Sequence, residues 1–462
     1  MEEMTVKIWA DLGGSTLKIL VEMPNKSTVP IIMSSRVIEL DDWLVSNRTV
    51  AMFDISPQAD AIVRFGKGYY AVGKLAEQYA SDVTNSTELK QPKQNTAIPK
   101  LLAVVGIIKQ KYELPTRFAV ELTLLLPFPE YQFVKDGGNN FQADLKKALS
   151  YFEFRGENYE VNLANFGCKP EGSGLIMLRY LQQQDRQDWL LNSKIAALML
   201  GHRNTSILLY DYGTPSGYTN NLGFYQIIQT VIDSSLGQSA AALTEAIYKA
   251  NDDISPNNPH IQALAMTKGK SKRAELTRLV KAIASAQKNR WQQIASWAKL
   301  LVDDVDELII GGGTALLYQK AIRETFHSTR LFWAVATEKE PIPQIPPQPI
   351  GPSGHREEWE NKLLAAKPGH DALKAKEALE QYEEQLLSYQ QQQADYELQL
   401  KVVQAALSRE KLPLLQLQHQ SQAIIEEIAQ TFFSQEVKSD ERRFRVTQFV
   451  DIYGVWKAIE NA

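Results

Sequence analysis

The chain has 462 residues, of which 44% are hydrophobic, and this is enough to bury the cores of two or three domains of ~100–200 residues each. Its 50 basic and 54 acidic side chains give a formal net charge of -4, so no overall positive field attracts nucleic acid or an anionic membrane. One cysteine excludes an internal disulfide, and the longest apolar run, 101–108, is far shorter than the ~18 residues of a membrane span, so we expect a cytoplasmic protein without a transmembrane segment.

The first predicted element is a strand–turn–strand unit. Two short apolar runs, 6–10 and 17–21, flank the stretch DLGGSTLK. Glycines free the turn from side-chain bulk, so that consecutive backbone N–H groups can surround an anion, while hydroxyls and an ammonium group add further donors. The candidate phosphate-binding residues are Gly13, Gly14, Ser15, Thr16 and Lys18. A plain hairpin with a polar turn is the alternative.

An acid in the same turn needs a separate explanation. Asp11 ends the first strand and would repel a phosphate unless a cation lay between them. The single Cys and six scattered His show no zinc-ligand spacing, so a hard ion on carboxylates is expected. Asp11 is therefore predicted to hold Mg²⁺ through its water shell.

A similar pattern returns in SILLYDYGTPSGYT. An apolar run over 207–210 ends in Asp211, and the residues that follow it supply the candidate second phosphate loop, Gly213, Thr214 and Ser216. Two such loops in one chain indicate an internal duplication with two facing lobes. In that arrangement Asp11 and Asp211 would flank one Mg²⁺.

A third glycine run follows a buried-strand pattern over 308–310. Gly311, Gly312 and Gly313 stand between this strand and a helix with apolar residues at helical spacing. A glycine triplet at that position lets the backbone approach a ligand closely, as at other nucleotide sites. It predicts a loop that contacts the nucleoside part of a nucleotide.

The character of the chain changes after residue 337. Six prolines within 341–352 favour an extended polyproline linker. A heptad seam follows, at Leu379, Tyr382, Leu386, Tyr389, Gln393, Tyr396, Leu400, Val403 and Leu407. Pro413 interrupts it before a second amphipathic stretch, 414–432, which favours an antiparallel helical hairpin. A polar helix lying on the second lobe is the alternative.

With these motifs in chain order, the sequence resembles the actin-like ATPase superfamily. DLGGSTLK is similar to its first phosphate loop, DYGTPS to its second and GGGTALL to its adenosine loop. GKGYYAVGKLAEQYA (66–80), LLLPFPEY (124–131) and FVDIYGVWK (449–457) are similar to segments of the bacterial plasmid-segregation actins, the ParM/StbA group. The resemblance implies a two-lobed α/β fold of duplicated, ribonuclease-H-like design, here with a helical, coiled-coil-like insertion near the C-terminus.

The resemblance also implies a catalytic group. In this superfamily a residue on the segment that connects the lobes orients or activates water, and GCKPEGSGL offers Glu171 at the matching position. A carboxylate beside the terminal phosphate can accept a proton from the attacking water. Glu171 and Asp211 are thus the candidate catalytic residues, although Glu171 could instead be an acid favoured at a helix start behind Pro170.

The expected organisation has four parts. Residues 1–200 form the first lobe, with a peripheral insertion over about 24–95, and residues 201–336 form the second. The proline-rich linker and helical hairpin occupy 338–443. The final helix, 444–462, returns to the first lobe.

The resemblance implies that the protein binds and hydrolyses ATP with Mg²⁺ and polymerises into nucleotide-dependent filaments, with GTP as the alternative nucleotide. DNA or plasmid segregation is the expected task, with an adaptor protein linking the filament to its cargo and no direct contact with nucleic acid. Three alternatives stay open: a cell-shape or envelope-associated filament, a small-molecule kinase of the same fold, and a non-polymerising nucleotide-gated scaffold.

Overall fold

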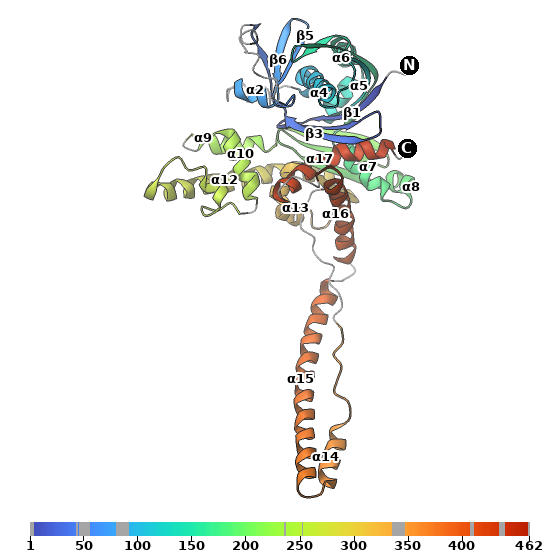
Figure 1. The fold of residues 1–462 in the computed structure, drawn as a ribbon, viewed down its shortest axis with the longest axis vertical. Coiled ribbons are helices and arrows are strands. Elements are labelled where there is room, and N and C mark those ends of the chain that lie inside the picture. Colours follow the sequence, from blue (N-terminus) through green and yellow to red (C-terminus); the bar gives the residue numbers. More distant parts are fainter. Residues whose placement is uncertain are drawn as a thin grey trace. The chain divides into compact units, whose positions relative to one another are not determined.

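The structure is a computed structural model that describes residues 4–42, 45, 56–79, 92–234, 237–251, 253–334, 347–406, 411–433 and 439–460. Side chains are described outside 139, 402–421 and 439–444. The chain divides into two compact units, unit 1 (Met1–Thr337 with Gln420–Ala462) and unit 2 (Glu338–His419). The elements can be followed in Figure 1. No helix of the described residues is long and apolar enough to cross a membrane.

The first sheet of unit 1 has nine strands in the order β3-β2-β1-β7-β9-β8-β5-β6-β4. β1 pairs antiparallel with β2 and parallel with β7, and β7 pairs parallel with β9. The strands are β1 (Thr5–Leu12), β2 (Thr16–Glu22), β3 (Thr28–Ser34), β4 (Val37–Leu40), β5 (Ala61–Phe65), β6 (Gly68–Val72), β7 (Arg117–Leu126), β8 (Phe152–Phe154) and β9 (Glu157–Pro170).

The second sheet has five strands in the order β12-β11-β10-β13-β14. β10 pairs antiparallel with β11 and parallel with β13, which pairs parallel with β14. The strands are β10 (Lys194–Leu200), β11 (Thr205–Asp211), β12 (Thr214–Asn220), β13 (Glu307–Gly311) and β14 (Arg330–Trp333).

The two sheets share one topology. In each five-strand core, counted in chain order, the strands lie in the order 3-2-1-4-5. Strand 2 pairs antiparallel with strands 1 and 3, and strands 4 and 5 run parallel to strand 1. The predicted two-lobed α/β fold of duplicated design is therefore confirmed. Sheet pairing places β10 with the second lobe, which thus begins near residue 194 and not at 201.

Each lobe has its own hydrophobic core. In the first, the apolar run 101–108 lies inside helix α4 (Ala97–Lys111), which is buried along most of its length. A β-carbon at Gly106 would lie 2.3 Å from the ring of Phe154, so glycine lets this helix approach β8 closely. The remaining helices of the first lobe are α2 (Lys74–Tyr79), α5 (Phe128–Lys135), α6 (Phe141–Ser150), α7 (Ser173–Leu181) and α8 (Arg186–Leu191), with 3-10 turns η1 (Lys93–Thr96) and η2 (Gly138–Asn140).

The second core lies between the second sheet and a group of helices dominated by the 34-residue α12. These are α9 (Tyr225–Asp233), α10 (Ala240–Ala250), α11 (Pro259–Gln262), α12 (Gly269–Val302) and α13 (Gln319–Thr325), with the 3-10 helix η3 (Gly313–Tyr318). The predicted peripheral insertion, 24–95, contains β4, β5 and β6, which extend the first sheet through β8.

The last helix, α17 (Ser439–Glu460), packs beside α7 and also contacts β1 and β2 of the first lobe (Figure 1). α17 corresponds to α7 in the duplicated design. α7 follows β9, the fifth core strand of the first sheet. In unit 1, β14, the fifth strand of the second sheet, is followed by α16 and then by α17. Unit 2 lies between β14 and α17 in the chain.

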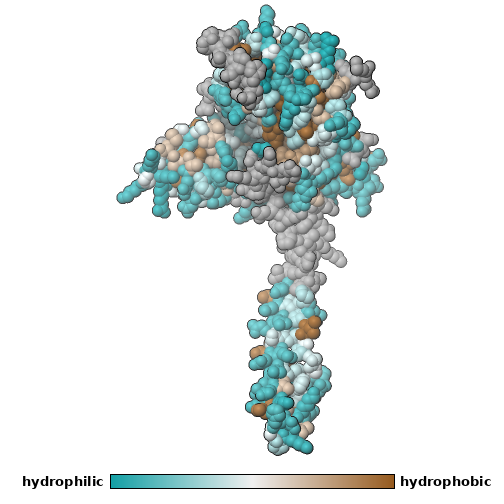
Figure 2. All heavy atoms as spheres, in the orientation of Figure 1, coloured by the Kyte–Doolittle hydropathy of each residue, from teal (hydrophilic) through white to brown (hydrophobic). Residues whose placement is uncertain are grey.

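Unit 2 contains α14 (Arg356–Ala365) and α15 (His370–Ala406), which pack against each other. The extended segment 347–355 runs alongside α15. Tyr382 Oη donates to Gly354 O at 3.1 Å, and Gly351 lies against the ring of Tyr389. Two residues of the predicted heptad seam, Tyr382 and Tyr389, therefore face the segment 351–354, and Tyr382 also contacts Trp359 of α14. Leu407 of the seam and the prolines before 347 lie outside the described residues. The visible face of unit 2 is mostly hydrophilic (Figure 2). Leu373 and Leu387 are among its exposed apolar side chains.

The second amphipathic stretch is helix α16 (Lys411–Phe433), whose described side chains belong to unit 1. Phe432 contacts the rings of Phe449 and Tyr453 on α17, and Glu427 pairs with Lys457 at 2.6 Å. The described end of α16 therefore packs against α17, which differs from the expected hairpin of α15 with 414–432; the side chains of 411–421 lie outside the described residues. The expected insertion, 338–443, thus ends too late: residues 420–433 belong with the core.

Candidate functional site

The first candidate loop lies in the turn between β1 and β2. The strands pair Asp11 with Lys18 and Leu12 with Leu17, which leaves Gly13 to Thr16 at the turn. A β-carbon at Gly13 would lie 2.6 Å from the carbonyl oxygen of Thr16, so only glycine allows the turn to close this tightly. Ser35, just after β3, braces the turn by donating its Oγ hydrogen to Gly14 O at 2.9 Å.

Asp11 is buried and is held by two lysines. Lys18 Nζ lies 2.5 Å from its Oδ2, and Lys93 Nζ lies 2.9 Å from its Oδ1. Although burial alone would raise the pKa of Asp11, the two ammonium groups hold it well below its usual range. Asp11 is therefore an anion whose charge is already neutralised by the chain itself.

Glu171 joins the same cluster from the end of β9. Its backbone N–H donates to Leu126 O at 2.8 Å, which fixes the residue at the end of the parallel strands. One carboxylate oxygen pairs with Lys93, and the other accepts from Ser206 Oγ of β11 at 3.4 Å. Glu171 thus links the first lobe to the second.

The internal duplication identifies a second turn equivalent to the first. β10 and β11 pair Leu200 with Thr205, so residues 201–204, GHRN, occupy the place that GGST occupies in the first lobe. A β-carbon at Gly201 would lie 2.8 Å from the carbonyl oxygen of Asn204, the same contact that Gly13 makes with Thr16. The second loop is therefore the β10–β11 turn.

The second loop carries a histidine in a positive environment. Burial lowers the pKa of His202 to about 4, and the charges of Lys18 and Arg36 add to the effect. Its buried Nδ1 has no hydrogen-bond partner among the described residues. Beside it, Arg203 pairs with Glu130 of α5 at 3.1 Å. A half-buried neutral imidazole near two cations, with its Nδ1 buried, is an environment that an anionic ligand would stabilise.

The glycine triplet packs directly on the second loop. Gly311 ends β13, where it pairs in register with Met199 of β10. Gly312 has φ of 88°, and a β-carbon there would lie 2.4 Å from Leu200 O. Thr314 Oγ1 donates to Gly201 O at 3.0 Å. Gly313 then begins η3, so the expected helix starts as a 3-10 turn before α13.

The other predicted residues of the second lobe lie elsewhere. Asp211 pairs with Lys194 and Thr214, which places it at the start of β10, whereas Gly201 and Gly311 lie at its end. Six residues of β-strand separate the two ends, or ~20 Å. The structure therefore does not bring Asp211, Gly213, Thr214 and Ser216 to Asp11. These residues lie at the β11–β12 turn, and the β10–β11 turn at 201–204 lies at the opposite end of β11.

Two parts of the site, Lys93 and the 201–204 turn, were not predicted from the sequence. Lys93 lies 82 residues from Asp11 in the chain and 78 from Glu171, so no local spacing reveals it. The 201–204 turn shares a sequence pattern with the first turn. In both, a leucine at the end of an apolar run is followed by glycine (Gly13, Gly201), and a polar residue stands three positions after that glycine. The 201–204 turn has no acid before its glycine, whereas DYGTPS does, so the sequence alone favours DYGTPS.

Mg²⁺ can be tested against these donors. No group of three or more His, Cys, Asp or Glu among the described residues is arranged to hold a metal by itself. Asp11 and Glu171, however, converge on one ammonium nitrogen, so their carboxylates lie close enough to share a cation. Mg²⁺ commonly uses one or two carboxylates together with substrate phosphates, and this pair fits that requirement.

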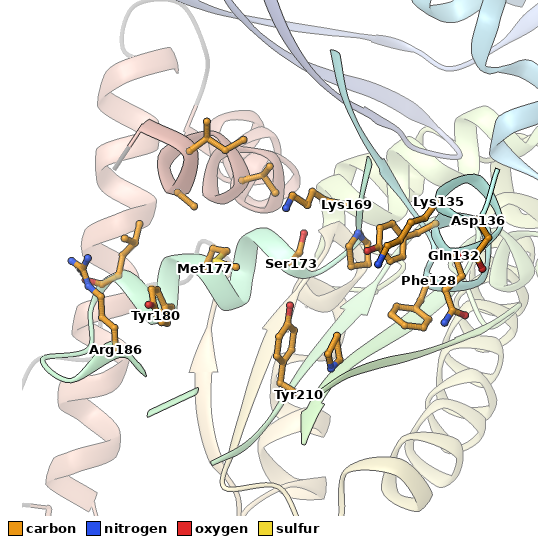
Figure 3. Close-up of a pocket in the computed structure, with 17 residues that line it drawn as sticks. Phe128, Gln132, Lys135, Asp136, Lys169, Ser173, Met177, Tyr180, Arg186 and Tyr210 are labelled. Atoms are coloured by element: carbon orange, nitrogen blue, oxygen red, sulfur yellow. Dashed lines mark hydrogen bonds between the residues drawn. The ribbon is translucent and has the colours of Figure 1, made fainter. Parts of the chain in front are cut away.

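A separate pocket of about 630 Å³ lies on another part of unit 1. Both lobes line it: Phe128 and Tyr131 come from α5, Tyr180 from α7, and Tyr210 from β11. Figure 3 shows Tyr210 pointing toward α7, with Lys135 and Lys169 near one end. None of the predicted phosphate-binding or catalytic residues lines this pocket, so it is distinct from the charged cluster.

No protein-family profile matches the sequence, and the search of curated proteins found no match. Among solved structures, a 15-stranded ParM filament from Clostridium botulinum has a TM-score of 0.49 at 16% identity, over 72% of this chain and 95% of that one. An Alp12 filament scores 0.42 at 17% identity over 71% and 93%. Ta0583, an archaeal actin homologue in complex with ADP, scores 0.40 at 15% identity over 70% and 91%. The likeness is one of fold.

Proposed function

We propose that the protein binds ATP with Mg²⁺ between the two equivalent turns and hydrolyses it. The observation that carries the proposal is that the β1–β2 turn and the β10–β11 turn, equivalent by duplication, share one cluster of charges. Lys18 contacts Asp11 beside the first turn, its charge helps to lower the pKa of the neutral His202 in the second turn, and Glu171 contacts both lobes. Two tight turns with positive side chains suit a ligand with several phosphates.

Each part of the site has a role. The backbone N–H groups of 13–16 and 201–204 would bind phosphate oxygens, and Lys18 would add a point charge. Gly311, Gly312 and Gly313 leave room for close approach of the nucleoside. Asp11 would hold the Mg²⁺ that supplies charge neutralisation for the phosphates.

Glu171 has the position of a base. In the hydrolysis of the terminal phosphate, an attacking water loses a proton as its oxygen bonds to phosphorus and the bridging oxygen leaves with ADP. Glu171 would accept that proton or orient the water, a role worth ~10²–10⁴ in rate. Its backbone anchor at Leu126 keeps the carboxylate in place between the lobes.

We propose further that nucleotide binding drives assembly into filaments for DNA or plasmid segregation, through an adaptor that links filament and cargo. The sequence supports this at three segments similar to plasmid-segregation actins, 66–80, 124–131 and 449–457. The pocket of about 630 Å³ adds support, because its walls come from both lobes and its shape must follow their arrangement.

Negative-stain microscopy and a phosphate-release assay on the purified protein test both statements. We expect filaments with ATP and Mg²⁺, few or none without nucleotide, and phosphate release that needs Mg²⁺. ATP hydrolysis without filaments would favour the scaffold or kinase alternatives, and a screen of small-molecule acceptors would separate those two. Absence of nucleotide binding would overturn the proposal.

A further inference from the structure

Lys93 lies between the two carboxylates of the site. Its side chain is 5% exposed, and its ammonium nitrogen contacts Asp11 Oδ1 at 2.9 Å and also Glu171 Oε1. Lys18 occupies the other oxygen of Asp11. The formal charges of these two carboxylates and two ammonium groups therefore cancel.

The charge of Lys93 is maintained by its partners. Burial favours a neutral amine, but Asp11 and Glu171 together raise the pKa of Lys93 above its usual range. Removing one member of such a buried set leaves an uncompensated charge, which is strongly unfavourable. A new anion that enters the site must therefore compete with a carboxylate for this ammonium group.

We propose that Lys93 is a switch that pairs with Glu171 in the nucleotide-free protein and transfers its ammonium group to the terminal phosphate of a bound triphosphate. This inference rests on the ATPase function proposed above and adds the residue that distinguishes triphosphate from diphosphate. A terminal phosphate carries nearly two negative charges and three acceptor oxygens, so it outcompetes a single carboxylate.

The exchange has a chemical consequence. Once Lys93 moves, Oε1 of Glu171 can accept a proton from water, while Oε2 keeps its contact with Ser206. The carboxylate is thus made available only when the phosphate to be cleaved is present. The four-carbon stem of lysine allows its ammonium group to move by changes of rotamer, without a shift of η1.

Titration calorimetry with ADP and with a non-hydrolysable ATP analogue, both with Mg²⁺, tests the switch. We expect the wild type to bind the triphosphate about 10-fold or more tightly than ADP, since one charge-assisted contact is worth that much. Lys93→Met should bind the two nucleotides with similar affinities, with its affinity for ADP changed by less than about 3-fold. Lys93→Arg should restore part of the preference, because it restores the charge.

Three further variants separate this role from a structural one. Lys100→Met is the matched control, because Lys100 is also 5% exposed, lies seven positions along the same segment, and donates to Thr96. It should keep the preference. Lys93→Met leaves Glu171 without its cation, which destabilises the fold. The double variant Lys93→Met with Glu171→Gln removes both charges and should also lack the preference, whereas Glu171→Gln alone should keep it.

The outcomes decide between the two proposals. A wild type that binds both nucleotides equally, or a Lys93→Met or double variant that still prefers the triphosphate, would overturn the switch while leaving nucleotide binding in place. A wild type that binds neither nucleotide would overturn the proposed function, and the switch with it.

Discussion

Gly174 of α7 and Gly454 of α17 face each other where the two helices cross, and neither position has room for a β-carbon. A β-carbon at Gly174 would lie 1.7 Å from Asp451 O, and one at Gly454 would lie 2.0 Å from Gly174 O. This close approach lets the Asp451 carboxylate accept from the N–H groups of Gly172 and Gly174, each at 2.8 Å. The C-terminal helix therefore caps the helix that follows Glu171.

Gly454→Ala should destabilise the protein by about 3 kcal/mol, at the upper end for overpacking, because the clash is with backbone. Helix propensity alone would favour alanine by ~1 kcal/mol, so the sign of the change tests the packing. Urea unfolding measures it. Gly167→Ala is the control, since a β-carbon there would only reach Thr123 Oγ1 at 3.9 Å. Equal stability of both variants would contradict the crossing.

Asp11 and Asp211 should behave differently. Asp11→Asn removes the carboxylate held by Lys18 and Lys93, and we expect it to weaken Mg²⁺-dependent ATP use at least ~10-fold. Asp211→Asn changes an exposed residue at the opposite end of β10 and should leave ATP use near the wild-type level.

Phosphate release at several Mg²⁺ concentrations measures both variants. Equal losses would instead support the sequence-based prediction that the two acids share one ion.

Glu171→Gln should separate binding from chemistry. The amide keeps the shape of the side chain but cannot accept the proton of the attacking water, so phosphate release should fall by ~10²-fold or more. ATP binding should persist, and filaments should last longer once formed. A variant that releases phosphate at the normal rate would return Glu171 to the role of a helix-start acid.

His202 should make stability depend on pH. Its folded pKa of about 4 lies below the ordinary 6.5, so the unfolded chain binds a proton that the folded protein excludes. The stability that this contributes is complete above pH 6.5 and is lost as the pH falls through about 4, by up to ~3 kcal/mol. Urea unfolding of His202→Asn between pH 7 and 4 should show less acid loss than the wild type. Equal losses of stability in the wild type and His202→Asn between pH 7 and 4 would contradict this prediction.

The same histidine can report the phosphates. A bound anion beside His202 should raise the pKa of the imidazole, so nucleotide binding at pH 5–6 should take up protons. Calorimetry in two buffers of different ionisation enthalpy measures the uptake. His202→Asn should abolish it without abolishing binding, and an unchanged proton count would place the phosphates elsewhere.

Two deletions test where the insertion ends. Replacing 338–419 by a Gly/Ser linker removes unit 2 and should leave a folded protein that still binds ATP. Replacing 338–443 also removes Phe432 and Glu427, which pack on α17, and should lower the unfolding temperature by several degrees. If the shorter deletion is insoluble, unit 2 is part of the core.

The sequence by itself determined the local parts of this protein. Asp11 and Lys18 are paired across one tight hairpin, so their meeting depends only on the register of two adjacent strands. The glycine turn between them, the glycine triplet at 311–313 and the proline-rich start of the insertion are likewise local patterns. Each could be predicted because neighbouring residues fix it.

Tertiary structure alone decided which loop of the second lobe joins the site. GHRN and DYGTPS both follow a strand, but the parallel pairing of β10 with β13, about 110 residues apart, places Gly201 beside Gly311 and Asp211 at the other end. Lys93 reaches Asp11 and Glu171 across some eighty residues, and Asp451 reaches Gly172 across 279. Such contacts depend on which elements pack together, and a buried charge is held in place by whatever opposite charge the packed fold brings to it.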